Sequence, residues 1–492
     1  MIQELGVGIV YSPGSQEFLE SNSDLLDYLE IEPQTFWIKR SGLDSYVFDI
    51  EIGNYLKNLG KPFIFHGVGF PVGSHFQDFT HINCLHEMMK DLNPKWMSEH
   101  LSFNTFDSNG NKINTNFLLP PLQTHENCEL ISCTIKNYQD KVGLPFAFET
   151  ATNYFKKQLF ELEDSHFISQ IAEKSDCHIL LDIHNIWANQ LNGRQSVEDL
   201  VNKIPTERVI EIHLASGFWF KNYYLDAHSD IVSDELFELS SRIIRKLPNL
   251  KGITFEILPD YLPFTESKSL RTNIEGIKRL WDSRGKDCHY PKAKRKIDEI
   301  ITEIKVEPTP SAIEWENLIG ALSIRMSPLE SKHINLIADD LGLGIVQELI
   351  DKFRASALVA TLKFTCRYII KVYGSDYLLS IFKEFWKGCP PKLFAVETGL
   401  DFSTYLLTNT GMEIFKLPYL KELITYEYQS LQSIYYEKDV NYSSDANPID
   451  ILNSLLDNDF EFSKIERGNY EVTIKKEDYS NEFNKLNGTF HS

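Results

Sequence analysis

Cysteine is sparse in this sequence and shows no paired spacing. The seven cysteines are scattered along 492 residues, and none forms a CxxC motif. This distribution argues against a disulfide framework and against a zinc site built from thiolates. A reducing compartment, the cytoplasm, is therefore the expected location.

Positive charge and long apolar runs are also lacking. The 49 basic residues are outnumbered by 70 acidic ones, which gives a formal net charge of −21. Such a chain suits metal cations or a basic peptide better than nucleic acid or an anionic membrane. It contains no uninterrupted run of about 18 apolar residues and no signal-peptide pattern at its N-terminus, so we expect no membrane association.

Residues 1–285 show the pattern of an α/β protein. The hydrophobic content of 42% is ample for folded cores, and the length predicts two or three domains. Short apolar runs alternate with amphipathic ones, which predicts a (β/α)8 TIM barrel. A doubly wound sheet is the alternative, but Pro71 in HGVGFPVGS falls where the helix after a dinucleotide-binding loop should begin. The expected strands are 5–11, 28–33, 61–68, 95–103, 144–150, 177–185, 208–216 and 251–258.

A second domain is expected after the barrel. Residues 286–311 are basic at their start and rich in turn residues, and we interpret them as a linker. Residues 312–492 are predicted to form a mostly α-helical domain that ends in a small β-hairpin within 460–476. Its expected helical runs are 315–326, 333–353, 358–374 and 417–437.

The predicted barrel strands share one feature, because most of them end in a carboxylate or an imidazole. In a closed barrel these ends converge on one mouth, where active sites are built. Crowded carboxylates stay ionised only if cations lie among them, and mixed His and carboxylate donors suit Fe(II), Mn(II) or Zn(II). The strand-end residues are Glu32, His66, Glu99, His100, Glu149, Asp182, His213 and Glu256, and Asp226 and His228 follow in the loop after the seventh strand. This number of donors indicates two or three ions.

Each of these residues, taken alone, has a structural interpretation. A single acid or histidine at a strand end is more often a helix cap or a surface residue. Glu99 is adjacent to His100, so the two side chains should face opposite sides of the strand. His75, His81 and His86 have no matching partners, and we interpret them as structural. Repetition on six consecutive strands favours a metal centre.

At these residues the chain resembles the multinuclear non-haem iron-dependent oxidative enzymes, a family that includes the methanobactin biosynthesis oxidase. The motifs are HGVGFPVGS, MSEHLSF, FAFET, LLDIHN, EIHLASG, LDAHSD and TFEILPD, and they follow the order of the family. The resemblance implies a (β/α)8 barrel that holds two or three irons in mixed Fe(II)/Fe(III) states. It also implies O2 as co-substrate and oxidation of a Cys or an Asn/Asp side chain in a ribosomally made peptide.

The resemblance also implies roles for individual residues. Glu149, Asp182, His213 and Glu256 correspond to the central catalytic ring of metal ligands. His66 and His100 correspond to ligands of a neighbouring iron that Glu149 bridges, and Asn185, Asp226 and His228 to a third site. Two positions depart from the family pattern. Thr150 replaces the usual Asn, and His184 stands where a small polar residue or Asn is common.

The C-terminal region has a resemblance of its own. Residues 402–431 are similar to the tail of the partner proteins that bind the leader of the precursor peptide. This similarity implies a fused leader-binding domain. The alternative is a helical domain that supports stability or a homodimer.

Two other functions fit the same residues. Sugar isomerases and abasic-site endonucleases also use Glu/Asp/His/Glu rings at barrel mouths. The net charge disfavours DNA as substrate, and His66, His100, Asp226 and His228 exceed what an isomerase needs. A non-catalytic peptide- or metal-binding protein is the third hypothesis.

Overall fold

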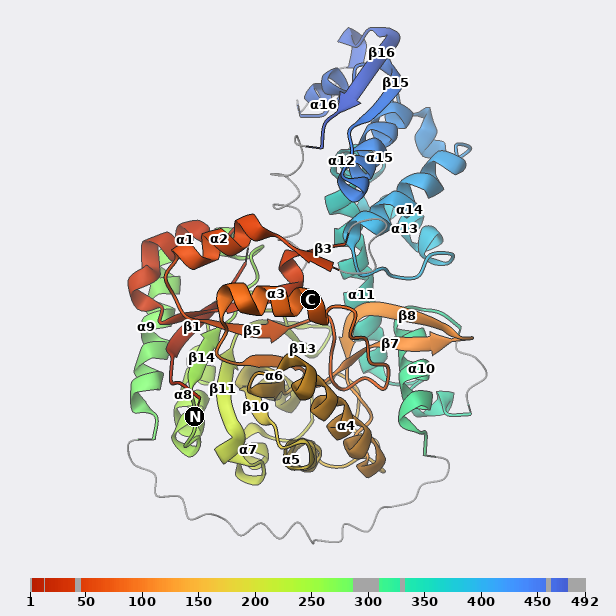
Figure 1. Cartoon of the computed structure of the whole chain (residues 1–492). Helices are drawn as coiled ribbons and strands as arrows, with labels where there is room; N and C mark the ends of the chain where they lie inside the picture. Colours follow the sequence, from red (N-terminus) through yellow and green to blue (C-terminus); the bar gives the residue numbers. More distant parts are fainter. Residues whose placement is uncertain are drawn as a thin grey trace.

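The computed structural model describes residues 2–12, 14–39, 46–285, 309–327, 332–456 and 462–476. An α/β barrel is followed by a mostly helical C-terminal domain that packs along one side of it (Figure 1). Most of the predicted linker, 286–308, lies outside the described residues.

The barrel is closed, and all eight of its strands are parallel. The eight expected strands are confirmed, in the order β1-β14-β11-β10-β9-β6-β5-β2 around the barrel. They are β1 (Gly6–Tyr11), β2 (Tyr28–Ile31), β5 (Phe63–Gly67), β6 (Met97–His100), β9 (Phe146–Glu149), β10 (His178–Asp182), β11 (Val209–Leu214) and β14 (Gly252–Phe255). The predicted α/β barrel class is therefore correct, and the doubly wound alternative is wrong.

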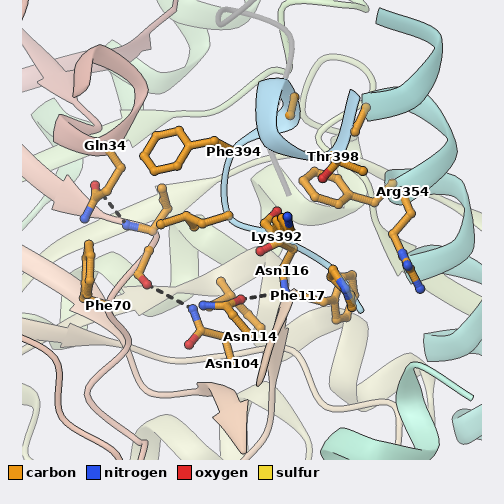
Figure 2. A pocket seen from close by; sticks show the side chains of 18 of the residues that line it. Gln34, Phe70, Asn104, Asn114, Asn116, Phe117, Arg354, Lys392, Phe394 and Thr398 are labelled. Atoms are coloured by element: carbon orange, nitrogen blue, oxygen red, sulfur yellow. Dashed lines mark hydrogen bonds between the residues drawn. The ribbon is translucent and has the colours of Figure 1, made fainter. Parts of the chain in front are cut away.

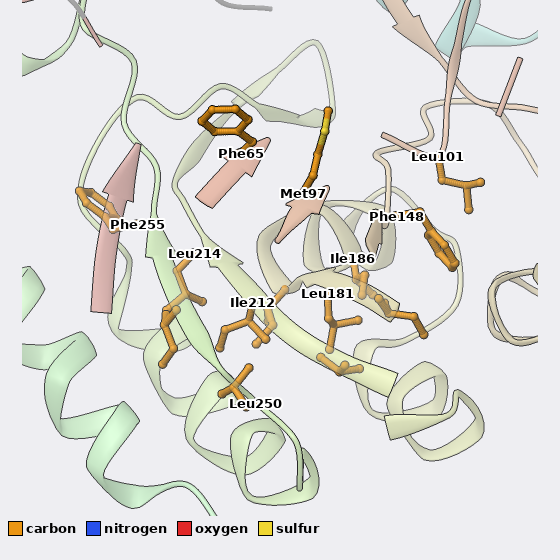
Figure 3. Close-up of a cluster of buried hydrophobic side chains, with 14 of the residues drawn as sticks. Phe65, Met97, Leu101, Phe148, Leu181, Ile186, Ile212, Leu214, Leu250 and Phe255 are labelled. Carbon is orange, nitrogen blue, oxygen red and sulfur yellow. The ribbon is translucent and has the colours of Figure 1, made fainter. Parts of the chain in front are cut away.

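Helices surround the barrel and cover the apolar outer face of its strands. They are α1 (Gln16–Asn22), α2 (Ile50–Asn58), α3 (Ile82–Leu92), α4 (His125–Val142), α5 (Asp164–Ser175), α6 (Ile183–Leu191), α7 (Val197–Lys203), α8 (Asp234–Ile243) and α9 (Ser267–Ser283). Figure 3 shows Phe65, Met97, Phe148, Leu181 and Ile212 in this buried layer. Since strand neighbours point to opposite faces, a residue next to one of these apolar positions points into the barrel.

Three two-stranded sheets extend from the loops at the carboxyl ends of the strands. They are β3 (Trp37–Lys39) with β4 (Tyr46–Phe48), β7 (Phe103–Ser108) with β8 (Asn111–Leu119), and β12 (Gly217–Phe220) with β13 (Tyr223–Asp226). These additions build a rim around the barrel mouth.

The C-terminal domain has its own hydrophobic core, built mainly by helices. The helices are α10 (Ala312–Ser323), α11 (Leu341–Thr361), α12 (Lys363–Tyr373), α13 (Ser375–Trp386), α14 (Ala395–Thr408), α15 (Leu420–Tyr436) and α16 (Pro448–Leu456). Two antiparallel strands, β15 (Val440–Ala446) and β16 (Arg467–Ile474), end the described chain. Within the described residues, none of the helices combines the length and hydropathy needed to cross a bilayer.

Two details of this domain differ from the sequence prediction. The expected hairpin within 460–476 supplies only β16, and the other strand precedes α16. Phe462 instead packs on Tyr368 and Tyr419, which holds its segment in a 3-10 turn against the helices. The predicted helix 333–353 begins only at 341, because the Asp340 carboxylate caps the Gly342 amide and starts α11 there.

A third buried cluster joins the two domains. Phe103, Phe106 and Leu119 of the β7–β8 sheet pack against residues of α10 and α11, among them Trp315 and Ile319. Polar contacts flank this core, and they come from the loops after β5 and β9 and from β7. Because these segments follow the carboxyl ends of barrel strands, the C-terminal domain is fixed at the mouth.

Candidate metal centre at the barrel mouth

The predicted ligands converge at the carboxyl ends of the strands. Strand alternation turns five of them inward, because each directly follows an apolar residue of the outer layer: His66, Glu149, Asp182, His213 and Glu256. Asn185 lies on α6, and Asp226 and His228 lie at the end of β13 and in the loop after it. Five groups of three His, Asp or Glu side chains could each hold an ion, with ligand atoms that lie within 4.8 Å of one another. Three of these groups consist entirely of predicted ligands, and the other two add His184 or the pair Glu30 and Glu211 to predicted ones; some residues belong to two groups.

The first group contains His66, His100 and Glu149. The Nε2 atoms of His66 and His100 lie 3.2 and 2.9 Å from Glu149 Oε2. Their Nδ1 atoms lie 2.8 Å from Ser98 Oγ and 3.0 Å from the Gly67 carbonyl. These outer contacts hold both rings with Nε2 toward the carboxylate, as in metal-bound histidines. Burial alone would raise the pKa of Glu149, but the charges of His100 and His66 outweigh it and hold that pKa well below its usual range.

The second group contains Glu149, Asp182 and His213, and Glu256 lies beside it. His213 Nδ1 lies 3.2 Å from Glu256 Oε2 and 4.0 Å from Glu149 Oε1. Asp182 is fully buried, and burial together with the charges of Glu149 and Glu256 raises its pKa well above its usual range. A bound cation would reverse this repulsion.

The third group contains His184, Asp226 and His228. Asp226 Oδ1 lies 3.1 Å from His184 Nδ1 and 2.8 Å from His228 Nε2. His228 Nε2 also lies 3.6 Å from Glu256 Oε2, which links this group to the second one. The sequence left the role of His184 open, and the structure places it in a group that could hold an ion.

Asn185 lies in the same cluster, but its amide makes protein contacts. Its Nδ2 donates to Glu149 Oε1 at 3.1 Å, and its Oδ1 accepts from Thr152 Oγ1 at 2.6 Å. Thr150, the other departure from the family pattern, donates nothing to the cluster; its Oγ1 accepts from the Asp182 amide at 3.0 Å. The role of Asn185 as a metal ligand therefore stays a prediction.

Two strand-end acids remain outside these groups. Glu32 precedes a 3-10 turn and accepts from Thr35 Oγ1 at 3.2 Å. Glu99 accepts from the His100 amide at 2.9 Å and belongs to none of the groups among the described residues. Glu99 Oε1 also lies 3.5 Å from His100 Nδ1, so its carboxylate contacts the ring of this predicted ligand although Glu99 stands outside the group.

The sequence prediction missed a layer of buried acids beneath the mouth. Glu30 Oε2 lies 3.1 Å from His213 Nε2, and Glu211 Oε1 lies 3.6 Å from the same atom. Trp96 Nε1 donates to Glu211 at 2.7 Å, and Thr254 Oγ1 donates to Glu30 at 2.6 Å. Glu30 and Glu211 stand two residues before Glu32 and His213, so the strand period of two could have shown that they also face inward.

The donors present fit divalent transition metals. Several buried ligand atoms make no hydrogen bond within the described structure, namely Glu149 Oε2, Asp182 Oδ2, His184 Nδ1 and Nε2, His213 Nδ1, Asp226 Oδ1, His228 Nε2 and Glu256 Oε2. Leaving such atoms unpaired in a buried site costs free energy, which coordination to a cation would recover. Imidazole and carboxylate donors are those of iron, manganese and zinc sites.

Comparison with known proteins finds a matching family model, related sequences and similar folds. Residues 5–279, more than half of the chain, match the model for the RiPP precursor modification enzymes MbnB/TglH/ChrH. A UPF0276 protein of Neisseria meningitidis serogroup B is 27% identical over 291 residues, which cover 58% of this chain and 99% of that protein. A UPF0276 protein of Vibrio vulnificus is 31% identical over 180 residues, 35% of this chain and 60% of that protein. Among solved structures, the D-psicose 3-epimerase of Clostridium cellulolyticum H10 with D-tagatose is similar with a TM-score of 0.34 and 10% identity, over 56% of this chain and 96% of that one.

Proposed function

From the premise that this chain belongs to the MbnB/TglH/ChrH family of RiPP precursor modification enzymes, we propose that it is an O2-dependent multinuclear non-haem iron enzyme. Its substrate is a ribosomally synthesised precursor peptide, and the side chain that it oxidises is Cys or Asn/Asp. Family membership favours this function over the isomerase, endonuclease and non-catalytic alternatives.

The observation that carries the proposal is the sharing of ligands between neighbouring groups. Glu149 belongs to the first and second groups, and Asp182 belongs both to the second and to a group with His228 and Glu256. Carboxylates can bridge two ions, whereas one ion cannot use so many donors. The arrangement therefore supports two or three irons rather than a single zinc or manganese.

The protein's part in the chemistry is to hold the ions, to orient their ligands and to limit the access of solvent to them. Iron, when bound, would supply the activation of O2 and accept electrons from the substrate. Asp182 and His213 are fully buried, so the ligands lie in a site of low solvent access. Ser98 and Gly67 orient the two histidines of the first group before any ion binds.

The C-terminal domain supplies the second part of the proposal, the binding of the precursor leader. Three of its side chains accept hydrogen bonds from backbone amides at the mouth. Glu316 accepts from His75 N at 2.8 Å, Asn317 from Asp107 N at 2.8 Å and Asp340 from Lys156 N at 2.8 Å. A leader bound to this domain would hold the rest of the peptide beside the metal centre at high effective concentration.

Elemental analysis of the full chain, purified without added metal, tests the iron proposal. We expect two or three irons per chain, and Asp182→Asn should lower the iron content. Glu32→Gln is the matched control, because Glu32 also ends a strand but belongs to no ligand group in the described structure. One zinc or manganese per chain, or full iron content in Asp182→Asn, would contradict the proposal.

The substrate is tested with the short peptides encoded next to this gene. Each is incubated with the iron-loaded protein and O2, and the product is measured by mass spectrometry. A photo-crosslinker in the leader should label residues 312–476 in wild-type protein. Cross-links confined to the outer helices of the barrel would show that the leader binds elsewhere.

A further inference from the structure

A cavity of about 160 Å³ lies between the barrel rim and the C-terminal domain (Figure 2). The barrel contributes the loop after β2, the loop after β5 and the β7–β8 sheet, and the C-terminal domain contributes α11 and the start of α14. A cavity of this size holds about one side chain, since an apolar cavity of ~150 Å³ admits a benzene ring.

The cavity adjoins the strands that carry two predicted ligands. Val68 and Gly69 line it and directly follow β5, the strand of His66. Asn104 lines it from β7, four residues after His100, and its Nδ2 donates to the Gly69 carbonyl at 3.0 Å. A group bound here is therefore held beside the metal centre.

The charge of the lining is opposite to that of the protein. Although the chain has 70 acidic residues, no carboxylate lines this cavity within the described parts of the chain. Its two cations are Arg354 and Lys392, and Asp401 already pairs with Lys392. The guanidinium of Arg354 is the charge left for a ligand.

Arg354 is buried with incomplete pairing. It is 5% exposed; its Nη2 donates to the Cys389 carbonyl at 2.6 Å, and its guanidinium lies 4.7 Å from the centre of the Trp386 ring. No ion pair is formed by Arg354 among the described residues, and its Nε has no hydrogen-bond partner. Burial lowers the pKa of Arg354 to about 10, as expected for a charge without a counter-ion.

Two further polar atoms of the lining are buried and unpaired. Among the residues that the structure describes, Gln34 Nε2 is a donor without an acceptor, and Asn116 Oδ1 is an acceptor without a donor. A peptide backbone offers one carbonyl and one amide per residue, which could accept from Gln34 Nε2 and donate to Asn116 Oδ1. Aromatic rings, including Phe70, Phe117 and Phe394, form the rest of the wall (Figure 2).

We propose that this cavity is a recognition site for a carboxylate-bearing residue of the precursor peptide. The side-chain carboxylate of an Asp or Glu pairs with Arg354, while the peptide backbone on either side of that residue bonds with Asn116 and with Gln34, which lies at the other end of the cavity (Figure 2). The proposal rests on the proposed function, since it names the part of the substrate that the interdomain cavity selects. Precursor peptides of this enzyme should then carry an acidic residue close to the oxidised one.

The test uses two small probes, N-acetylglutamate N-methylamide and its glutamine counterpart, with saturation-transfer NMR on the full chain. We expect the acidic probe to bind about tenfold more tightly, the difference that one charge-assisted hydrogen bond makes. Arg354→Gln should abolish this preference, and the control Arg367→Gln, an exposed arginine on α12, should keep it. Equal binding of both probes, or a preference that survives Arg354→Gln, would overturn the proposal.

A second variant keeps the test decisive if Arg354→Gln does not fold. Ala395→Leu narrows the cavity from the start of α14 without changing any charge. It should weaken the acidic probe about tenfold; undiminished binding would place the probe elsewhere and refute the site. Iron content is measured in the same samples. If the protein contains two or three irons but does not bind the acidic probe, only this inference is refuted. If it binds the probe but contains no iron, the proposed function is refuted.

Discussion

Glu30→Gln tests whether the acids beneath the mouth position the metal ligands. The His213 ring lies between two carboxylates, with Nε2 3.1 Å from Glu30 Oε2 and Nδ1 3.2 Å from Glu256 Oε2. A carboxylate behind a histidine fixes its tautomer and orientation and makes it a better ligand. Glutamine keeps the shape of the side chain but loses the charge, and its NH2 group can turn toward Nε2.

Loss of such an outer carboxylate typically costs 10- to 100-fold in metal affinity, which corresponds to about 1.4 to 2.8 kcal/mol. We expect a value near the upper end, because Glu30 and His213 are both fully buried and no solvent can replace the contact. The assay is iron retained after dialysis against increasing concentrations of a chelator, with thermal unfolding of the metal-free protein as a control for folding. Iron retention equal to that of the wild type in a folded Glu30→Gln protein would refute the positioning role.

Three further predictions concern single ligands, pH and the domain contact. His184→Ala should remove about one iron per chain, because His184 belongs to one ligand group only, and unchanged iron content would contradict this. Burial raises the pKa of Glu316 from 4.5 to about 8. Between pH 4.5 and about 8 the folded protein therefore keeps a proton that the unfolded chain has released. The free energy of unfolding falls as the pH rises through this range. Glu316→Gln should therefore raise the free energy of unfolding by about 3 kcal/mol at pH 7 but by little near pH 4.5, as measured by urea unfolding. Gly342→Ala should destabilise the protein by roughly 1–3 kcal/mol, because its Cβ would clash with the Tyr154 carbonyl. Gly344→Ala on the same helix is the control, since its Cβ meets open space and should stabilise the protein by up to about 1 kcal/mol. Equal melting temperatures of the two variants would refute the contact.

The barrel and most of its mouth could be predicted from sequence because two local signals coincide. Most strands carry an apolar residue for the helical layer and then a polar residue for the interior, as in Phe148 followed by Glu149. The barrel closes these repeated pairs into one site without any further information. Glu30 and Glu211 were not predicted because they stand inside their strands and not at the strand ends. They follow the same alternation two residues earlier along the strand.

The domain contact could not be predicted from sequence. Phe106 and Ile319 are more than 200 positions apart and meet in one buried cluster, and nothing in either local pattern names the other as partner. The sequence also could not predict the polar lining of the interdomain cavity, since Gln34, Asn116 and Arg354 come from three separate segments. Local periodicity shows which side chains are buried, but not which distant surface buries them.

One segment couples the metal centre to the C-terminal domain. The loop that leaves β5 begins two residues after His66, lines the interdomain cavity with Val68 and Gly69, and reaches Glu316 through the His75 amide. A peptide residue in the cavity would therefore contact the loop that begins next to a predicted metal ligand. Under the proposed function, a leader-binding domain fused to the barrel would keep this contact in place, whereas a separate partner protein would have to re-form it on each association.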